Sequence, residues 1–229
     1  MRALANWFIA LLFTAAWAVV LLGLAEHIRQ QTDAREATAD AFSVVVDAGH
    51  GGFDGGAVGT LTGVIEAELN LCVAKLLEEE LTARGAVVVM TRADGMALGK
   101  DKDKDMARRR EIISDPSVDL VVSVHLNKFT DRSVSGAMAY YMQGSDAGQA
   151  LAQAVIDRVT DAIGRDRRLA NPGDYFMIRE CTAPAVLVEC GFLSNPKDEQ
   201  LLQDAAHQKA LAAAIADGVM AYRETAGAE

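Results

Sequence analysis

The stretch SVVVDAGHGGFDGGAVG, residues 43–59, decides how the rest of the chain is interpreted. Its beginning, Ser43–Gly49, is an apolar run that closes on glycine, a pattern that predicts a buried β-strand followed by a tight turn. His50 comes directly after this turn, and further glycines follow it. A single histidine beside an apolar strand is usually structural. Its meaning therefore depends on what the other strands bring to the same place.

Alternating strand and helix patterns continue along the chain. Several strands are apolar throughout, as parallel strands are when helices cover both faces of their sheet. The expected fold class is therefore α/β: a single domain with a mostly parallel, twisted sheet covered by helices on both faces. The charged run GKDKDKD, residues 99–105, is expected to be a solvated loop. Strands are predicted at residues 43–49, 86–92, 119–127 and 135–142 and within 183–195, and helices at 66–83, 106–114, 198–222 and from a Ser145 cap through Ile163.

The N-terminal segment differs in composition from the rest. Residues 3–25 carry no charged side chain, and a membrane-spanning helix needs roughly 20 apolar residues, whereas a signal-peptide core has about 7–15. We therefore expect residues 1–25 to be an uncleaved signal anchor; a cleaved signal peptide and a buried soluble helix are the alternatives. Residues 26–41 are polar and are predicted to be a linker. The folded domain is expected at residues 42–223, followed by a short tail at 224–229.

Composition narrows the classes of function. The 229 residues are 51% hydrophobic, enough for one full α/β domain. The formal net charge of −10 argues against a nucleic-acid partner, because binding nucleic acid usually needs a basic surface. The cysteines, Cys72, Cys181 and Cys190, are odd in number and do not indicate a disulfide framework. Buried free thiols are expected, and a disulfide between Cys181 and Cys190 stays open as the alternative.

Titratable side chains stand where three of the predicted strands end. His50 follows the first strand, His125 lies at the end of the third, and Glu189 lies at the end of the fifth. Ligands bind beyond the C-terminal ends of parallel strands, so these side chains are expected to share a site. Glu66 is a fourth candidate, because it begins a predicted helix on the apolar stripe, where a nonpolar residue would be expected. An acidic first turn that interacts with the helix dipole is the alternative for Glu66.

Two histidines and two carboxylates suit a zinc-dependent hydrolase. Imidazole and carboxylate are zinc ligands, and a catalytic zinc has three protein ligands and one open position. The remaining carboxylate can accept a proton from the attacking water and pass it to the leaving group. The chain contains no HExxH motif, no G-x-S-x-G nucleophile motif and no glycine loop ending in G-K-[ST]. The ligands must therefore come from separate elements.

The motifs VVVDAGHGGFDGGAVG, GVIEAELNL, DLVVSVHLN and PAVLVECGFLSNP resemble those of the zinc-dependent N-acetylmuramoyl-L-alanine amidases of bacterial cell walls, the amidase_3 type. The resemblance covers about residues 43–222. It implies hydrolysis of the amide between N-acetylmuramic acid and L-alanine in peptidoglycan. It also implies one Zn²⁺ per chain, held by His50, Glu66 and His125, with Glu189 as the catalytic residue.

The same resemblance assigns supporting residues around the site. Arg92, in the motif TR, and Arg109, before the third strand, are expected to be structural. Asn127 and Asn195 are expected to shape the groove or order loops, with Asn127 as a substrate-binding candidate. Asn195 precedes a proline, so turn formation is its alternative explanation.

Two positions depart from the family pattern. Leu126 stands where many members have alanine, and its larger side chain could alter the width of the groove. Cys190 follows Glu189, where aliphatic residues are common. Because successive side chains of a strand point to opposite faces, Cys190 is expected to pack in the core.

The short chain, its N-terminal segment and the stretch at 171–196 resemble most the amidases of endospore-forming bacteria, which implies a function in spore-cortex maturation. The implied partners are the glycan–peptide strands of peptidoglycan, the membrane through the N-terminal segment and, as for some members, an activating protein. The implied location is the extracytoplasmic face of the bacterial cell envelope, with the protein anchored or secreted. Two rival functions stay open: another zinc peptidoglycan peptidase, such as a carboxypeptidase, and a non-catalytic cell-wall-binding module.

Overall fold

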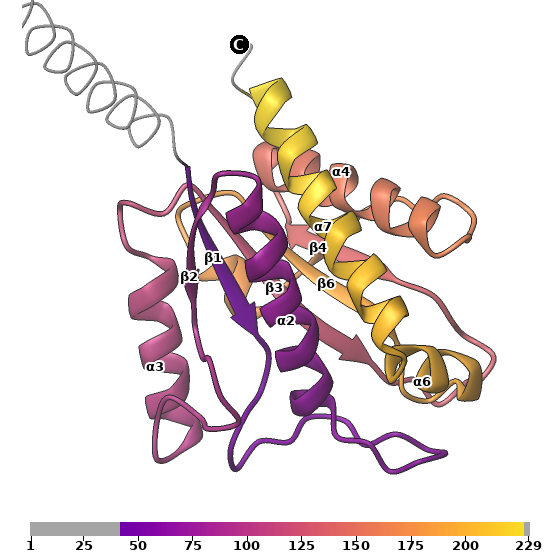
Figure 1. The fold of residues 1–229 in the computed structure, drawn as a ribbon. Helices are drawn as coiled ribbons and strands as arrows, with labels where there is room; N and C mark the ends of the chain where they lie inside the picture. Colours follow the sequence, from indigo (N-terminus) through magenta and orange to yellow (C-terminus); the bar gives the residue numbers. More distant parts are fainter. Residues whose placement is uncertain (1–41, 227–229) are drawn as a thin grey trace, which may run out of the picture. The chain divides into compact units, whose positions relative to one another are not determined.

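A computed structural model describes residues 42–226, and their central feature is a sheet of six strands (Figure 1). The predicted signal anchor and linker, residues 1–25 and 26–41, lie outside the described residues. Within residues 42–226, no helix is long and apolar enough to cross a bilayer. The strands are β1 (Ser43–Ala48), β2 (Val87–Met90), β3 (Leu120–Asn127), β4 (Met138–Met142), β5 (Asn171–Gly173) and β6 (Ala185–Phe192). The helices are α2 (Glu66–Ala83), α3 (Lys102–Ile113), α4 (Asp146–Ala162), α5 (Phe176–Arg179), α6 (Pro196–Leu202) and α7 (Ala205–Ala226).

The strands pair in the order β2-β1-β3-β6-β4-β5. The strands β2, β1, β3 and β6 are parallel, which confirms the predicted mostly parallel sheet. β4 is antiparallel to β6, and β5 is parallel to β4. β4 follows β3 through a loop without a helix, and a connection of this kind turns the chain back instead of starting another parallel strand. The sheet is therefore mixed at this edge.

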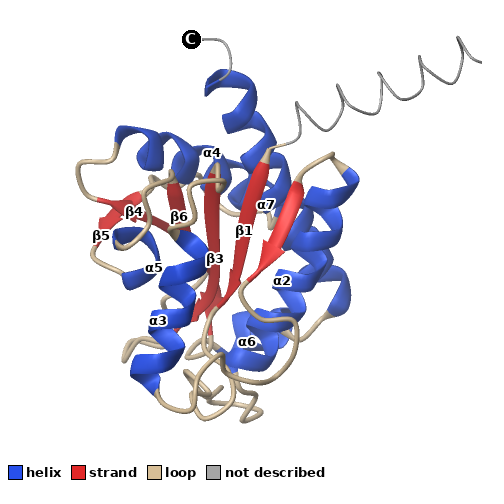
Figure 2. Ribbon diagram, turned by 90° about the vertical axis from the view of Figure 1, so that its left-hand side faces the viewer, coloured by secondary structure: helices blue, strands red, loops and turns tan. Residues whose placement is uncertain are grey.

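Helices cover both faces of the sheet, as predicted. Val44 and Val46 of β1 have no exposed surface and pack in a core with residues of α2, α4 and α7. Val45, between them, points to the opposite face, where it packs with Ile113 of α3 and Met177 of α5. Figure 2 shows α3 and α5 on the near face of the sheet. Strand residues buried on both faces explain why these segments are apolar without alternation.

The helix α2 has the bounds that its apolar period predicts. Its buried stripe includes Leu69, Val73 and Leu77. Glu66, the first residue of the helix, is only 3% exposed, so it lies on the buried stripe as expected. The carboxylate therefore faces the end of the sheet, and the first turn of α2 is part of the site described below.

The three cysteines are free, so the alternative disulfide between Cys181 and Cys190 is not formed. Cys190 is 2% exposed and packs in the core with the helices α2, α4 and α7. Cys181 is half-buried. The expectation of a buried thiol is wrong for Cys72, which is exposed because the buried stripe of α2 turns away from it.

The prediction that the run GKDKDKD, residues 99–105, is a solvated loop is wrong for its second half. Its second half is the first turn of α3, which begins four residues before the predicted start. Asp101 caps this helix by accepting a backbone N–H at 2.9 Å. Asp105 is 4% exposed, because its carboxylate accepts a hydrogen bond of 2.9 Å from Arg109 one turn later. The alternating charges of this run gave no indication that one face of the helix, with Asp105 and Arg109, is buried.

Short elements and one helix break also differ from the predictions. β5 and α5, with three and four residues, are too short to carry a recognisable period. The predicted helix at 198–222 is two helices, because α6 ends at Leu202 and α7 begins at Ala205. The second of these continues to Ala226, so part of the predicted tail at 224–229 is helical.

The cap of α4 gives a test of the fold. Ser145 accepts the N–H of Gly148 at 3.1 Å, as the sequence predicted, and so satisfies a backbone donor of the first turn. Ser145→Ala should lower the free energy of unfolding by about 1 kcal/mol, measured by denaturant titration of the full-length protein. Ser145→Thr keeps the hydroxyl and should stay close to wild type. Equal destabilisation by both substitutions would contradict the capping interaction.

Candidate active site and metal centre

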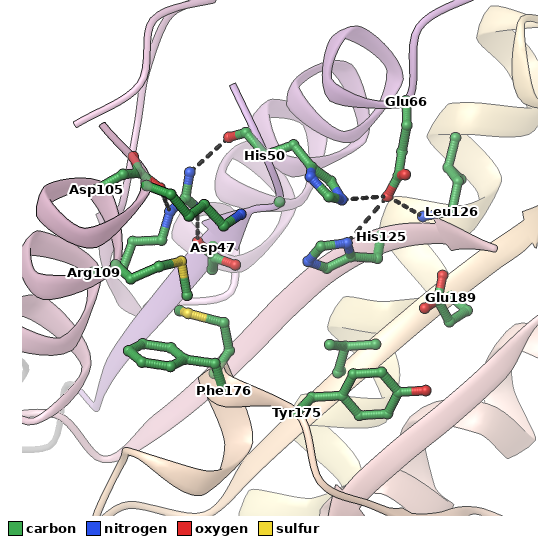
Figure 3. A pocket seen from close by; sticks show the side chains of 15 residues that line it. Asp47, His50, Glu66, Asp105, Arg109, His125, Leu126, Tyr175, Phe176 and Glu189 are labelled. Carbon is green, nitrogen blue, oxygen red and sulfur yellow. Dashed lines mark hydrogen bonds and ion pairs between the residues drawn. The ribbon is translucent and has the colours of Figure 1, made fainter. Parts of the chain in front are cut away.

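Four elements deliver titratable side chains to one pocket at the C-terminal ends of the parallel strands. His50 follows β1, and Glu66 begins α2. His125 lies two residues before the end of β3, and Glu189 lies in β6. All four line a pocket of about 320 Å³ (Figure 3). The prediction that these residues come together in one site agrees with this arrangement.

The carboxylate of Glu66 contacts both imidazoles through one oxygen (Figure 3). Its Oε1 atom is 3.2 Å from Nε2 of His50 and 3.1 Å from Nδ1 of His125. One potential ligand atom from each of the three residues lies within 4.8 Å of the others, so the group could hold a metal ion. The two rings meet edge to face, with centroids 4.9 Å apart.

Backbone and amide donors hold the Glu66 carboxylate in place. Oε2 accepts the N–H of Ala57 at 2.8 Å, and Oε1 accepts the N–H of Leu126 at 3.1 Å. The amide of Asn70, one turn along α2, donates to Oε1 at 3.2 Å. Burial alone would raise the pKa of Glu66, but hydrogen bonds and charge from His125 and His50 hold that pKa well below its usual range. Glu66 is therefore ionised at neutral pH.

The backbone around His50 is shaped for close approach. His50 has a φ of +61°, in the left-handed region that residues other than glycine rarely adopt. A Cβ atom at Gly49 would lie 2.3 Å from Cε1 and Nε2 of His125, so only glycine fits beneath this ring. A Cβ atom at Gly56 would lie 2.6 Å from Oε2 of Glu66. These two glycines leave room for the side chains of His125 and Glu66.

Arg92 braces the backbone that carries His50. Its guanidinium donates to the carbonyl oxygens of Ala48 at 2.8 Å and Gly49 at 2.9 Å. It also donates to the carbonyl oxygen of Ala67 at 2.8 Å, in the first turn of α2. Arg92 is 3% exposed. A single side chain thus ties the end of β1 to the start of α2.

Arg109 reaches the same turn from α3. It donates to the carbonyl oxygens of Ala48 at 3.0 Å and His50 at 2.6 Å. Its charge is balanced by the buried carboxylates of Asp105 and Asp47, both of which accept hydrogen bonds from it. Burial opposes ionisation of Asp47, but the charge of Arg109 holds the pKa of Asp47 below its usual range. The contacts of Arg92 and Arg109 are with backbone and carboxylates, which fits the structural functions expected of them.

Glu189 stands apart from the three clustered residues. It pairs with His125 in the register of β3 and β6 and is 7% exposed. Its Oε2 atom is buried and has no hydrogen-bond partner among the described residues. Burial raises the pKa of Glu189 to about 7, with the histidines opposing this shift and the charge of Glu66 adding to it. This carboxyl group can therefore gain or lose a proton near neutral pH.

The other wall of the pocket was missed by sequence reasoning. It includes Met106 of α3, Tyr175, and Phe176 and Met177 of α5. Lys102 lies at the α3 side of the pocket. The start of α3 at Lys102 and the short helix α5 were not predicted, and no local pattern indicates that these side chains face the site.

Asn127 and Asn195, the two asparagines expected to shape the groove or order loops, do not line the pocket. Asn127 accepts the N–H of Lys128 at 2.8 Å at the end of β3, and its expected contact with substrate stays a prediction. Asn195 caps α6, accepting the N–H groups of Lys197 at 3.0 Å and Asp198 at 3.2 Å. Asn195 therefore orders a turn.

Comparison with known proteins assigns a family to this arrangement. The profile of the N-acetylmuramoyl-L-alanine amidases, Amidase_3, matches residues 44–221. The chain belongs to this family. The family predicted from the four motifs is therefore confirmed, and the amidase class of hydrolase with it.

Relatives and solved structures agree with the amidase assignment. The germination-specific N-acetylmuramoyl-L-alanine amidase of Bacillus subtilis (strain 168) is 32% identical over 189 residues, 78% of this chain and 78% of that protein. The CwlD amidase from Clostridioides difficile, solved in complex with the GerS lipoprotein, is 30% identical and has a TM-score of 0.77 over 80% of this chain and 99% of that chain. The catalytic domain of the amidase CwlV from Bacillus (Paenibacillus) polymyxa is 34% identical, with a TM-score of 0.72 over 80% and 98% of the two chains.

The close contact at Gly49 gives a test of the amidase site. Gly49→Ala places a methyl group against the ring of His125 and should lower the free energy of unfolding by about 1–3 kcal/mol. It should also shift the imidazole NMR signals of His125. Gly95→Ala is the matched control, because a methyl group there meets nothing within 4 Å. Unchanged His125 signals in Gly49→Ala would contradict the close packing.

Proposed function

We propose that this chain hydrolyses the amide between N-acetylmuramic acid and L-alanine in peptidoglycan, with zinc held by His50, Glu66 and His125 and with Glu189 as the catalytic residue. The observation that carries this proposal is the convergence of two imidazoles and a carboxylate beside a second, buried carboxylate in one pocket. The family to which the chain belongs supports the reaction. The stem peptide is thereby removed from the glycan strand.

The donor set fits zinc. Two imidazole nitrogens and one carboxylate oxygen are ligands of the kind that catalytic zinc takes, and three such ligands leave a position open. A zinc ion there would polarise the amide carbonyl and lower the pKa of a water molecule toward about 7. Before any ion binds, the N–H groups of Ala57 and Leu126 already fix the orientation of the Glu66 carboxylate. Ligands held in this way need little rearrangement.

Glu189 supplies the proton transfers. As a carboxylate it accepts a proton from the water that attacks the amide carbonyl. As a carboxylic acid it then donates that proton to the nitrogen of the leaving L-alanine. A pKa near 7 suits a group that must perform both steps near neutral pH, and the unpartnered Oε2 atom is available for them.

Substrate contacts and cellular setting follow from the same proposal. The pocket wall formed by Tyr175, Phe176 and Met177 offers apolar and aromatic surface to an extended glycan–peptide.

We place the protein at the extracytoplasmic face of a bacterial envelope, anchored or exported by residues 1–25. Action on spore cortex is supported by the germination-specific relative, and an activating protein partner by the relative solved with a lipoprotein. The functional partner is therefore peptidoglycan, and nucleic acid is not expected.

Removal of one imidazole tests the metal centre. His125→Ala should bind zinc at least about 10-fold more weakly while the domain stays folded, because the ring lies near the end of β3 and is not part of the two apolar cores. Metal content after dialysis, measured by atomic absorption, reports binding, and circular dichroism reports folding. His207→Ala, on α7, is the control and should retain wild-type metal content. Equal metal content in both variants would make the ligand assignment wrong.

Removal of the catalytic carboxylate separates the amidase from its rivals. Glu189→Gln should lower kcat about 10²–10⁴-fold with zinc retained, because the carboxamide side chain of glutamine cannot accept and return the proton. Turnover is measured by mass spectrometry of peptidoglycan fragments, with the exposed Glu111→Gln as control. Intact stem peptides and peptide-free glycan identify an amidase. Released terminal amino acids would indicate a carboxypeptidase, and unchanged fragments with wild-type protein would indicate a wall-binding module.

A further inference from the structure

A buried carboxylate far along the sequence holds the loop that precedes Glu66. Glu199 of α6 is fully buried and points at this loop, residues 57–65. Its Oε2 atom accepts the N–H of Leu61 at 2.7 Å, and its Oε1 atom accepts the N–H of Thr62 at 2.7 Å. Both oxygens of one carboxylate are thus engaged by neighbouring backbone donors. Figure 1 shows this loop, between β1 and α2, extending toward α6.

Side chains complete this contact. The hydroxyl of Thr62 donates to Oε1 of Glu199 at 2.8 Å. Gly59 lies so close that an added Cβ atom would be 2.3 Å from the same oxygen. Burial opposes ionisation of Glu199, but the donors of Thr62 and Leu61 hold its pKa below the usual range. A charged carboxylate with this many donors needs the loop in one conformation.

The other end of the loop holds the Glu66 carboxylate. The N–H of Ala57 donates to Oε2 of Glu66 at 2.8 Å, and the N–H of Glu66 donates to the carbonyl oxygen of Ala57 at 2.9 Å. Val58 and Ile65 form a bridge across the base of the loop. The tip that Glu199 holds and the base that holds Glu66 therefore belong to one small closed unit.

We propose that Glu199 is a positioning residue for the metal centre, which acts by fixing loop 57–65 so that Ala57 orients the carboxylate of Glu66. The inference rests on the proposed function, because it takes Glu66 as a metal ligand. Asn195 contributes indirectly, since it caps the short helix that carries Glu199. The chemistry of the site thus depends on a carboxylate that contacts neither metal ligand nor substrate.

The neighbouring residue Asp198 provides a matched control. It lies on the same turn of α6 and is also buried, 4% exposed. Its carboxylate accepts the N–H of Gly136 at 2.6 Å and the N–H of Phe192 at 3.2 Å. Asp198 therefore anchors α6 to other segments and makes none of the contacts with loop 57–65. Loss of either carboxylate should destabilise the fold, but only loss of Glu199 should alter the metal centre.

The test compares Glu199→Gln with Asp198→Asn in the full-length protein, purified in mild detergent. Zinc affinity is measured by competition with a chromophoric chelator, and the ligand geometry by the visible spectrum of the Co²⁺-loaded protein. Glu199→Gln should bind zinc about 10–100-fold more weakly and shift the Co²⁺ bands, as substitutions behind metal ligands commonly do. Asp198→Asn should stay within about threefold of wild type.

A second variant disturbs the contact from the loop side. Gly59→Ala keeps Glu199 and its charge but places a methyl group against the carboxylate, so it should also shift the Co²⁺ bands. If folded Glu199→Gln and Gly59→Ala keep wild-type affinity and spectra, the inference is wrong while the proposed function stands. Wild-type protein that binds neither zinc nor Co²⁺ would overturn the proposed function and the inference together.

Discussion

The burial of one negative charge, on Glu66, is the constraint on which the rest of the site depends. A carboxylate that is 3% exposed at the end of an apolar sheet is unfavourable unless donors surround it. Here the donors come from the loop before α2, from the backbone after His125, and from α2 itself. Each donor fixes the position of its own element. The end of β3, the loop and the first turn of α2 are therefore held together by this one carboxylate.

Sequence alone predicted the four central residues because they interrupt simple patterns. His50, His125 and Glu189 stand at the ends of apolar strands, and parallel strands end at one edge of a sheet. Glu66 occupies an apolar position of a helical period. The parallel part of the sheet and the bounds of α2 follow from the same periods. These patterns predict which residues meet, whereas the functions expected of those residues come from the resemblance to a family.

The supporting contacts could not be predicted because they join residues that no period relates. Asp105 and Arg109 have the spacing of a helical ion pair, but the pair is buried only because Asp47 of β1 accepts from the same guanidinium. Nothing in the sequence distinguishes Glu199 from the other acidic residues, because its function depends on its contacts with the loop at 57–65. The pocket wall formed by α5 depends on four residues. Tertiary contact, rather than local propensity, determines all three.

The choice of arginine behind His50 follows from the geometry of the turn. His50 has a φ of +61°, which costs about 1–3 kcal/mol for a residue other than glycine. Arg92 donates to the carbonyl oxygens of Ala48 and Gly49, and Arg109 donates to that of His50, so the two side chains satisfy three successive carbonyl groups. A lysine presents a single ammonium group and could not reach oxygens so arranged, whereas the guanidinium is a planar fork. The strained turn persists because its carbonyl oxygens are held from two sides.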